Sequence, residues 1–320
     1  MLFHSTKKPT ELHIINLNKK QNATKKRLAA AKEAKEDTKL CKKLYDKLKK
    51  EKAVTESEEK KADAVVFVLD FQGDIKASAA DKLREEISAI LSCAKAGDEV
   101  VLRLESAGGQ VHGYGMAAAQ LERIKAAGLT LTVCVDKVAA SGGYMMACVA
   151  DKIIAAPFAI AGSIGVVSQM PNFYDFLKKH DIHMELFTAG EYKRTVTMFG
   201  ENDDEDRAKY QAELERIHEL FQAHIEKYRP SLDVKKVATG EFWFGSDALA
   251  LGLVDELGVS DSYILEKMQN HTVLALHTQQ KPTVAEKLGL AQACGEVLNK
   301  ATTFAKDAPL LNKLSSRLSL

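Results

Sequence analysis

The chain has 320 residues, of which 46% are hydrophobic and 28% charged, and it contains 19 glycines and 6 prolines. This composition excludes collagen-like, low-complexity and wholly disordered chains, because there is enough apolar side chain to form a core. The net charge is +1, but residues 1–62 carry 18 basic and 9 acidic side chains, residues 271–320 carry 6 and 3, and residues 63–270 carry 21 and 32. The sequence therefore predicts an acidic central region between two basic ends.

The five cysteines are scattered without the spacing of a metal site, so we expect neither a metal nor another cofactor. No stretch approaches the roughly 20 uninterrupted apolar residues of a membrane span. The first four residues do not open a signal peptide either. The chain as written is therefore expected to be soluble.

Residues 19–61 are rich in Lys, Ala and Glu and contain neither Gly nor Pro. Their leucines suit one thin apolar stripe on a long solvated helix, and a poorly ordered spacer is the alternative. A lysine run can also bind nucleic acid or an anionic membrane, but the near absence of aromatic residues argues against a nucleic-acid partner. We expect residues 1–62 to form a charged helical arm or spacer.

Short apolar runs then alternate with helical patterns, which predicts an α/β domain with parallel sheets and flanking helices over residues 63–270. The expected strands are 65–69, 100–104, 129–135, 153–154 and 184–187. The expected helices are 78–95, 113–127, a small-residue helix that opens at Ser141, a long amphipathic helix at 203–228, and short helices at 246–251 and 261–268. Because the apolar pattern weakens after residue 270, we expect 271–320 to be a peripheral tail.

A glycine turn, ESAGGQ at 105–110, directly follows one expected strand and precedes a helix. Gly108 and Gly109 permit a tight turn and leave backbone N–H groups free to face an anion. A simple connecting turn would need the same glycines. Taken alone, this motif does not decide between the two interpretations.

A second junction of the same kind, KVAASGGY at 137–144, places Ser141 at the start of a helix. A serine there commonly caps the helix with its hydroxyl. The alternative is a nucleophile whose developing oxyanion meets the helix N-terminus and nearby glycine amides. Two such junctions in succession lie at the same edge of a parallel sheet, which favours a functional site.

A nucleophilic serine needs a base, and the G-x-S-x-G elbow of the α/β hydrolases is absent. Among nine histidines, His112 alone can be placed near the glycine turns. The other candidate is Lys193, in a loop after an expected strand. A lysine serves as a base only when burial lowers its pKa, and most lysines are solvated. The residues by themselves leave the base open.

Four motifs together resemble the signal peptide peptidase A family of serine–lysine peptidases. They are LES-x-GG at 104–109 with HGYG at 112–115, DKVAASGGY at 136–144, AGSIGV at 161–166 and G-x-YK at 190–193. The first motif and YKRT at 192–195 most resemble the SohB branch. The resemblance covers about residues 65–268. Ala107 departs from it, because the family usually has proline there, and the segment after Lys193 lacks a proline that many members carry.

The resemblance implies a ClpP/crotonase-like fold and a Ser-Lys dyad. By this analogy Ser141 attacks the scissile carbonyl and Lys193 is the general base. Ser163 would hydrogen-bond the Lys193 amine, and the backbone N–H groups of Gly109 and Gly142 would form the oxyanion hole. Family membership thus changes Lys193 from an unremarkable surface lysine into the expected base.

The resemblance also implies partners and a location. The expected substrates are small or unstructured peptides, such as membrane-derived peptides or signal-peptide remnants. A single copy of the domain suggests a homo-oligomer, an octamer being one candidate, with sites facing an interior. The expected location is the bacterial inner membrane, on the periplasmic face, through an upstream anchor that this chain does not contain, although the +9 arm fits poorly with that face.

Two other functions remain as alternatives to a serine endopeptidase. A crotonase-type acyl-CoA enzyme also uses glycine-turn oxyanion holes, but it would need acidic catalytic residues at helix starts, where this chain has a serine. A non-catalytic oligomeric scaffold would make the basic arm the functional part. Labelling of Ser141 by a fluorophosphonate probe would separate the peptidase from both.

Overall fold

The computed structural model describes residues 10–33, 64–190 and 192–280. The chain divides into two compact units, one formed by residues 13–277 and one by residues 1–12 with 278–320. The first unit contains all the candidate site residues, and the description below concerns it. Most of the expected arm (34–62) and of the expected tail (281–320) lies outside the described residues.

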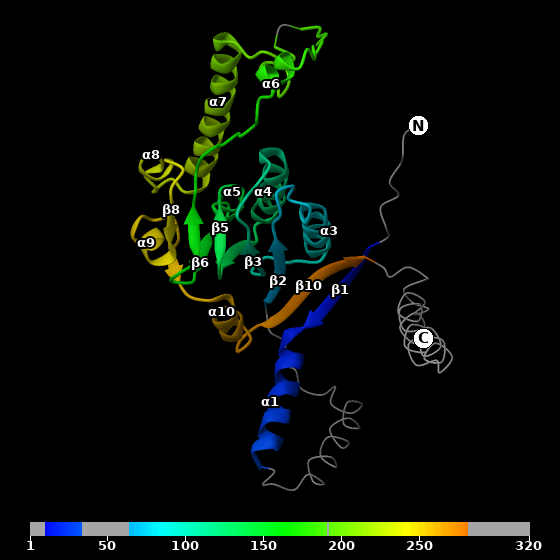
Figure 1. Ribbon diagram of the computed structural model, residues 1–320. Helices are drawn as coiled ribbons and strands as arrows, with labels where there is room; N and C mark the ends of the chain where they lie inside the picture. Colours follow the sequence, from blue (N-terminus) through cyan, green and yellow to red (C-terminus); the bar gives the residue numbers. More distant parts are fainter. Residues whose placement is uncertain (1–9, 34–63, 191, 281–320) are drawn as a thin grey trace, which may run out of the picture. The chain divides into compact units, whose positions relative to one another are not determined.

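The larger sheet has seven strands in the order β1, β10, β2, β3, β4, β6, β9, and the pairings from β10 through to β9 are parallel (Figure 1). Its strands are β1 (Thr10–Asn16), β2 (Val65–Gln72), β3 (Glu99–Glu105), β4 (Thr130–Val135), β6 (Lys152–Ala155), β9 (Glu256–Leu257) and β10 (Thr272–Gln280). The long apolar runs in the central strands arise because parallel strands are covered on both faces.

The smaller sheet has three strands, β5 (Val138–Ala140), β7 (Ile160–Gly162) and β8 (Phe242–Phe244), with β5 parallel to β7 and β7 antiparallel to β8. A single bridge between Ser106 and Ala139 connects the end of β3 to β5. The two sheets are therefore joined at the point where the first glycine turn begins.

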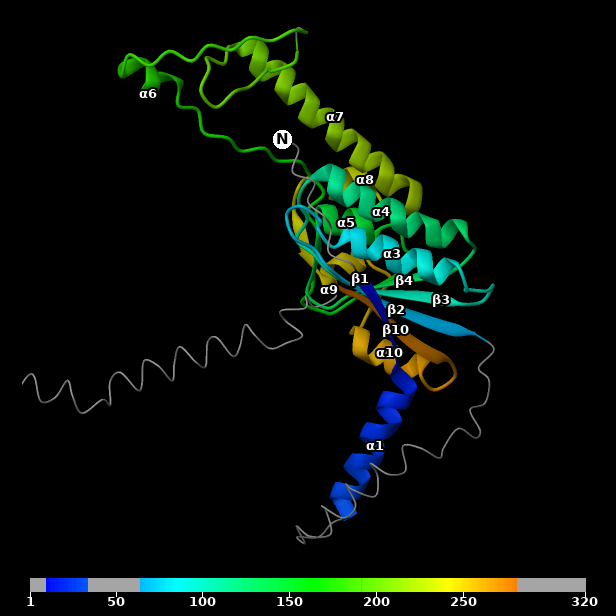
Figure 2. The ribbon, with the colours of Figure 1, turned by 90° about the vertical axis from the view of Figure 1, so that its right-hand side faces the viewer.

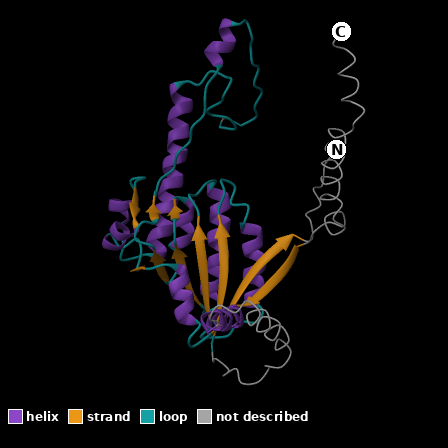
Figure 3. Cartoon of the chain, turned by 60° about the horizontal axis from the view of Figure 1, so that its bottom comes forward, coloured by secondary structure: helices purple, strands orange, loops and turns teal. Residues whose placement is uncertain are grey.

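Helices cover both faces of the larger sheet (Figure 3). Helices α3 (Ala80–Leu91) and α4 (Val111–Ala126) lie on one side, and α10 (Ser260–Lys267) lies on the other (Figure 2). The other described helices are α1 (Leu17–Glu33), α5 (Gly142–Ala147), α6 (Tyr174–Lys179), α7 (Asp204–Tyr228), α8 (Val234–Val237) and α9 (Gly245–Ala250). None of the helices in the described ranges is long and apolar enough to cross a membrane.

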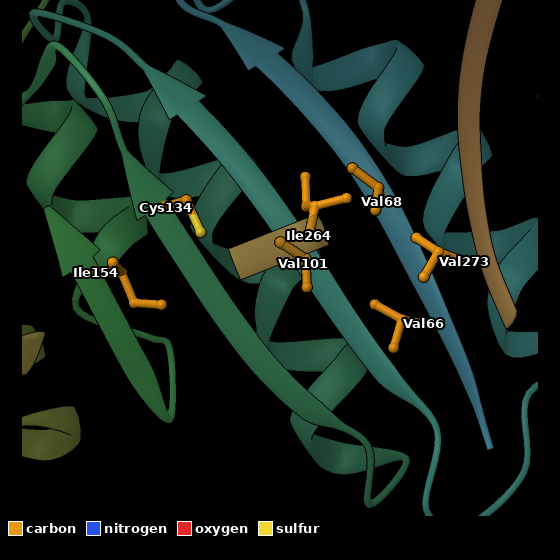
Figure 4. Packing of buried hydrophobic residues seen from close by; sticks show 7 residues of the cluster. All are labelled: Val66, Val68, Val101, Cys134, Ile154, Ile264 and Val273. Carbon is orange, nitrogen blue, oxygen red and sulfur yellow. The ribbon is translucent and has the colours of Figure 1, made fainter. Parts of the chain in front are cut away.

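The core on the α10 side consists of apolar side chains from adjacent strands, most of them β-branched, packed around Ile264 (Figure 4). Its other members are Val66, Val68, Val101, Cys134, Ile154 and Val273. Side chains alternate along a strand, so the intervening residues of β2 and β3 face α3 and α4 and are also buried. This double coverage makes the sheet a fixed platform for the loops at its carboxyl edge.

The predicted α/β class, with a mostly parallel sheet and flanking helices, is confirmed, while the ClpP/crotonase-like detail stays a prediction. Four of the five expected strands form as β2, β3, β4 and β6. The fifth, at 184–187, does not form: these residues adopt no regular structure, and all four are exposed. A short apolar run becomes a strand only when a neighbouring strand is available to pair with it.

Two boundaries also need correction. Residues 272–280, assigned from the sequence to a peripheral tail, form β10, which pairs with β2 from Thr272 opposite Val65 onward. Residues 10–16, assigned to the helical arm, form β1, and the helix begins at Leu17. Polar residues interrupt the apolar side chains of β1, and β10 has only a four-residue apolar run, at 273–276, followed by polar residues, so the local pattern of each strand is weak.

Candidate active site

The candidate site lies where two neighbouring parallel strands of the smaller sheet end. Ala140 of β5 pairs with Gly162 of β7, so Ser141 and Ser163 follow adjacent strands in register. The Ser141 N–H donates to the Gly162 carbonyl at 2.8 Å. The structure therefore brings these two predicted residues together.

Ser141 has an unusual backbone conformation, with φ of 51° and ψ of −119°. For a residue other than glycine, a backbone conformation with positive φ costs about 1–3 kcal/mol. Such a conformation persists only where the surrounding structure enforces it, often at functional sites. The Ser141 hydroxyl makes no capping hydrogen bond to α5. The N-cap interpretation is thus not seen here, and the hydroxyl is left for another role.

The first glycine turn packs directly against the start of α5. Gly108 has a φ of +90°, and a Cβ placed on it would lie 2.7 Å from both the Gly142 nitrogen and the Ser141 Cβ. Among the described residues, neither the Gly109 nor the Gly142 N–H donates a hydrogen bond to protein. One of these donors belongs to the residue after Ser141 and the other to the residue after Gly108; Gly109 is exposed and Gly142 buried.

Ser163 also has a positive φ, of 50°, and its N–H donates to the Glu241 carbonyl at 2.7 Å. The preceding Gly162 lies against the ring of Trp243, where a Cβ would come within 2.7 Å of a ring carbon. These contacts from β8 hold the end of β7 in place. Ser163 is half-buried and directly follows β7.

Lys193 lies in a different part of the unit. It belongs to the segment between β7 and α7, which carries α6 and extends away from both sheets in two views (Figures 1 and 2). Its side chain is exposed, and no hydrogen bond found among the described residues joins it to Ser141 or Ser163. No carboxylate of the described ranges forms an ion pair with its amine. No contact between Lys193 and Ser141 is seen among the described residues, and the dyad stays a prediction.

The other candidate base, His112, is exposed in the first turn of α4. It forms no hydrogen bond or ion pair with any residue that the structure describes. Its turn follows Gly109 and Gln110 directly, so it lies closer to the glycine turn in sequence than Lys193 does. Nothing in the geometry orients its ring toward Ser141.

Two side chains within the recognised motifs, Tyr114 and Asp136, make contacts that carried no predicted role. Tyr114 is fully buried and its hydroxyl contacts Ser106, the first residue of the glycine turn, at 2.6 Å. Asp136, before β5, accepts hydrogen bonds from the Ser260 N–H at 2.8 Å and the Ser260 hydroxyl at 2.5 Å. Tyr114 and Asp136 fall within the recognised motifs, but a single sequence does not show which partners they meet.

The thiols near the site are poor candidates for chemistry. Burial raises the pKa of Cys134 to about 12, and it also raises the pKa of the Cys148 thiol. Both thiols therefore stay protonated near neutral pH, and a thiolate is the reactive form. In the ranges that the structure describes, no group of three or more His, Cys, Asp or Glu side chains is arranged to hold a metal ion.

The comparisons with known proteins fit this arrangement. Residues 123–274 match peptidase family S49, and residues 2–121 match the N-terminal region of family S49. The probable protease SohB of Haemophilus influenzae is 55% identical over 298 residues, which cover 89% of this chain and 83% of that protein. The chain belongs to peptidase family S49.

Two further S49 relatives illustrate the range of similarity. The probable protease SohB of Buchnera aphidicola subsp. Schlechtendalia chinensis is 46% identical over 272 residues, covering 82% of this chain and 89% of that protein. Protease 4 of Haemophilus influenzae is 34% identical over 161 residues, or 50% of this chain and 26% of that protein. The resemblance to the SohB branch is thus confirmed, and a peptidase is favoured over an acyl-CoA enzyme or a scaffold.

Proposed function

We propose that this S49 peptidase is a serine endopeptidase in which Ser141 is the nucleophile and Lys193 the general base. The observation that carries the proposal is the conformation of Ser141: a strained serine with an uncapped hydroxyl, next to Gly142 and in close contact with Gly108. The N–H groups of Gly142 and of Gly109, which follows Gly108, donate to no acceptor among the described residues. Attack of the hydroxyl on a peptide carbonyl would place the oxyanion near the Gly109 and Gly142 amides, which would stabilise it.

Lysine acts as a base near neutral pH only when its ammonium form is desolvated and no carboxylate stabilises it. Three of the acidic residues that follow Lys193 are engaged elsewhere: Asp203 and Asp206 cap α7, and Glu201 accepts from the Tyr174 hydroxyl at 3.0 Å. Because these carboxylates are held by other groups, they are not placed to stabilise the ammonium form of Lys193, which supports its role as the base. In the proposal, Ser163 holds the neutral amine once Lys193 reaches the site.

Lys193 is exposed in the single chain, so its ammonium group is not desolvated. We infer that assembly into a homo-oligomer removes the water around it. None of the described residues between 165 and 200 is buried, yet many are large and apolar. Those exposed by more than half are Val167, Phe176, Met184, Leu186, Phe187 and Tyr192. Exposed apolar surface of this extent is typical of a protein interface. Packing of this segment against neighbouring copies would bury it together with Lys193, and an octamer is one size to test.

The apolar surface next to the site supports peptides with apolar side chains as substrates. Phe242 pairs with Gly162, directly before Ser163, and is 55% exposed. Phe244 points to the same face of β8, with the two ring centroids 6.1 Å apart. Small or unstructured membrane-derived peptides, including signal-peptide remnants, carry side chains of this kind.

We also propose attachment to the bacterial inner membrane, on its periplasmic face, on the strength of the family resemblance.

The dyad is tested by two substitutions. Ser141→Ala and Lys193→Met should each lower turnover of a quenched-fluorescent peptide by about 10³-fold or more, and the double variant should be hardly worse, because the groups act as a unit. Lys179→Met, an exposed lysine of the same segment, is the matched control and should retain activity. Near-normal turnover by Lys193→Met would refute the dyad and make His112 the next candidate base.

The assembly is tested by light scattering and native mass spectrometry. Phe187→Glu places a charge on a side chain that is 87% exposed in the segment, and it should reduce both oligomer mass and activity. Leu265→Glu, at a 49% exposed leucine of α10, is the control outside the segment and away from the candidate site. A fully active monomer would contradict this part of the proposal.

The membrane location is tested by fractionation of the protein expressed from its native locus. Recovery of all the protein in the soluble fraction would contradict that location.

A further inference from the structure

Three separate chain segments meet around the buried side chain of Tyr114 in α4. Its hydroxyl lies 2.8 Å from the Asp74 carbonyl, in the turn after β2, and 2.6 Å from Ser106 Oγ, in the turn after β3. Its ring fills the space beside Gly142, where an added Cβ would lie 2.4 Å from a ring carbon. One side chain thus contacts both glycine turns and the segment after β2.

The direction of each hydrogen bond follows from the donors available. The Asp74 carbonyl can only accept, so the single hydroxyl proton of Tyr114 points toward it. Burial raises the pKa of Tyr114, which keeps that proton in place near neutral pH. The Tyr114 oxygen therefore accepts from the Ser106 hydroxyl.

Ser106 Oγ, having donated its proton, accepts from the Gly108 N–H at 3.1 Å. A continuous chain of hydrogen bonds thus runs from the Gly108 amide through Ser106 and Tyr114 to the carbonyl of Asp74. Bonds in such a chain polarise and strengthen one another in a low-dielectric interior. Ser106 is 2% exposed and Tyr114 is 0% exposed, so water does not compete for these groups.

The chain of hydrogen bonds fixes the orientation of the first glycine turn. With the Gly108 amide directed inward to Ser106, the next amide, that of Gly109, has no acceptor in the part of the chain that the structure describes. The fit leaves no spare room, because a Cβ on Gly73 would lie 2.2 Å from Ser106 Oγ and 2.4 Å from the Tyr114 oxygen. Any change in this cluster therefore changes where the turn lies against Gly142.

We propose that Tyr114 is a positioning residue for peptide hydrolysis, holding the Gly108–Gly109 turn against the start of α5 so that the Gly109 and Gly142 amides converge on one point. The proposal rests on the proposed function, in which these amides bind the oxyanion. Tyr114 acts through Ser106 and Gly108 and touches no substrate, since it is completely buried.

The test is Tyr114→Phe, which keeps the ring beside Gly142 and removes the hydroxyl. Loss of a direct oxyanion donor lowers kcat by about 10²–10³-fold, so loss of a group that only orients one should lower kcat by about tenfold. KM for the peptide substrate should stay within about twofold. The affinity for a peptide aldehyde, which forms a tetrahedral adduct with the nucleophile, should fall about tenfold in parallel.

The matched control is Tyr144→Phe. Tyr144 of α5 is also 0% exposed, but its hydroxyl donates to the Leu253 carbonyl at 2.8 Å and takes no part in the hydrogen bonds that hold the Gly108–Gly109 turn. Both variants lose one buried hydrogen bond and should show similar falls in Tm. Only Tyr114→Phe should lose kcat and aldehyde affinity.

Unchanged kcat and aldehyde affinity in Tyr114→Phe would overturn the proposal, as would equal losses in Tyr144→Phe. Ser106→Ala breaks the same chain at its middle and should also lower kcat about tenfold. If Tyr114→Phe fails to fold, Ser106→Ala decides, and normal turnover by that variant overturns the proposal. A failure of the proposed function would instead appear as an active Ser141→Ala variant, so the two failures are distinguishable.

Discussion

Gly108 offers a direct test of the close approach between the first glycine turn and the start of α5. Gly108→Ala introduces a Cβ at a φ of +90°, within 2.7 Å of the Gly142 nitrogen and 2.8 Å of the Ala140 carbonyl oxygen. The conformation alone costs an L-residue about 1–2 kcal/mol. The backbone atoms that the Cβ meets cannot rotate away, so overpacking adds about 1–3 kcal/mol.

Gly128→Ala separates these two contributions. Gly128 has a similar φ of +74°, but a Cβ there would meet no heavy atom within 4 Å. This variant should lose only the conformational part, about 1–2 kcal/mol, or roughly 2–8 °C in Tm. It lies after the end of α4, away from the candidate site, and should keep full activity.

Thermal unfolding and peptide turnover together decide the outcome. Gly108→Ala should be less stable than Gly128→Ala by about 1–3 kcal/mol, and it should lose about 10²-fold in kcat, because the displaced turn carries an oxyanion donor. Equal stability of the two variants would refute the close contact. Equal stability combined with full turnover would also refute the placement of the oxyanion hole at this turn.

Three further predictions concern residues around the site and the core. Burial works to raise the pKa of Glu99, but hydrogen bonds from Lys267, Tyr263 and Thr132 outweigh it and lower that pKa below 4.5. Its carboxylate therefore stabilises the fold above about pH 4.5, and Glu99→Gln should cost about 2 kcal/mol at pH 7, with the Tm difference vanishing as the pH falls below that value. Ser163→Ala should lower kcat less than Lys193→Met does, because it orients the base without bond making. Phe242→Ala should raise KM for apolar peptides severalfold with little change in kcat, which steady-state kinetics would show.

Local pattern in the sequence was enough to predict the central strands and the helices that flank them. Continuous apolar runs such as 65–69 and 100–104 mark strands that are covered on both faces, and they form β2 and β3. The glycine pairs at 108–109 and 142–143 marked turns at strand ends. Their position at one sheet edge followed from the parallel arrangement, and that expectation holds for the contact between Gly108 and the start of α5.

The sequence alone also identified Ser141 as a candidate nucleophile, but it did not show whether the Ser141 hydroxyl is free to react. Whether its hydroxyl caps a helix or stands free depends on backbone angles that β5, β7 and the first glycine turn impose together. The supporting roles of Tyr114 and Asp136 depend on partners 40 and 124 residues away. Local composition carries no record of such pairs, because each group is satisfied only after distant segments meet.

Tertiary structure likewise decided which weak apolar runs became strands. Residues 272–280 pair with β2 and join the core through Val273, whereas the stretch at 184–187, which Glu185 interrupts, pairs with no strand among the described residues and stays exposed. A strand satisfies its backbone polar groups only through a neighbour, so pairing overrides local propensity. The sequence by itself thus determined the layers and the serine at the sheet edge, while the tertiary structure decided the pairings, the hydroxyl network and the separation of Lys193 from Ser141 within one chain.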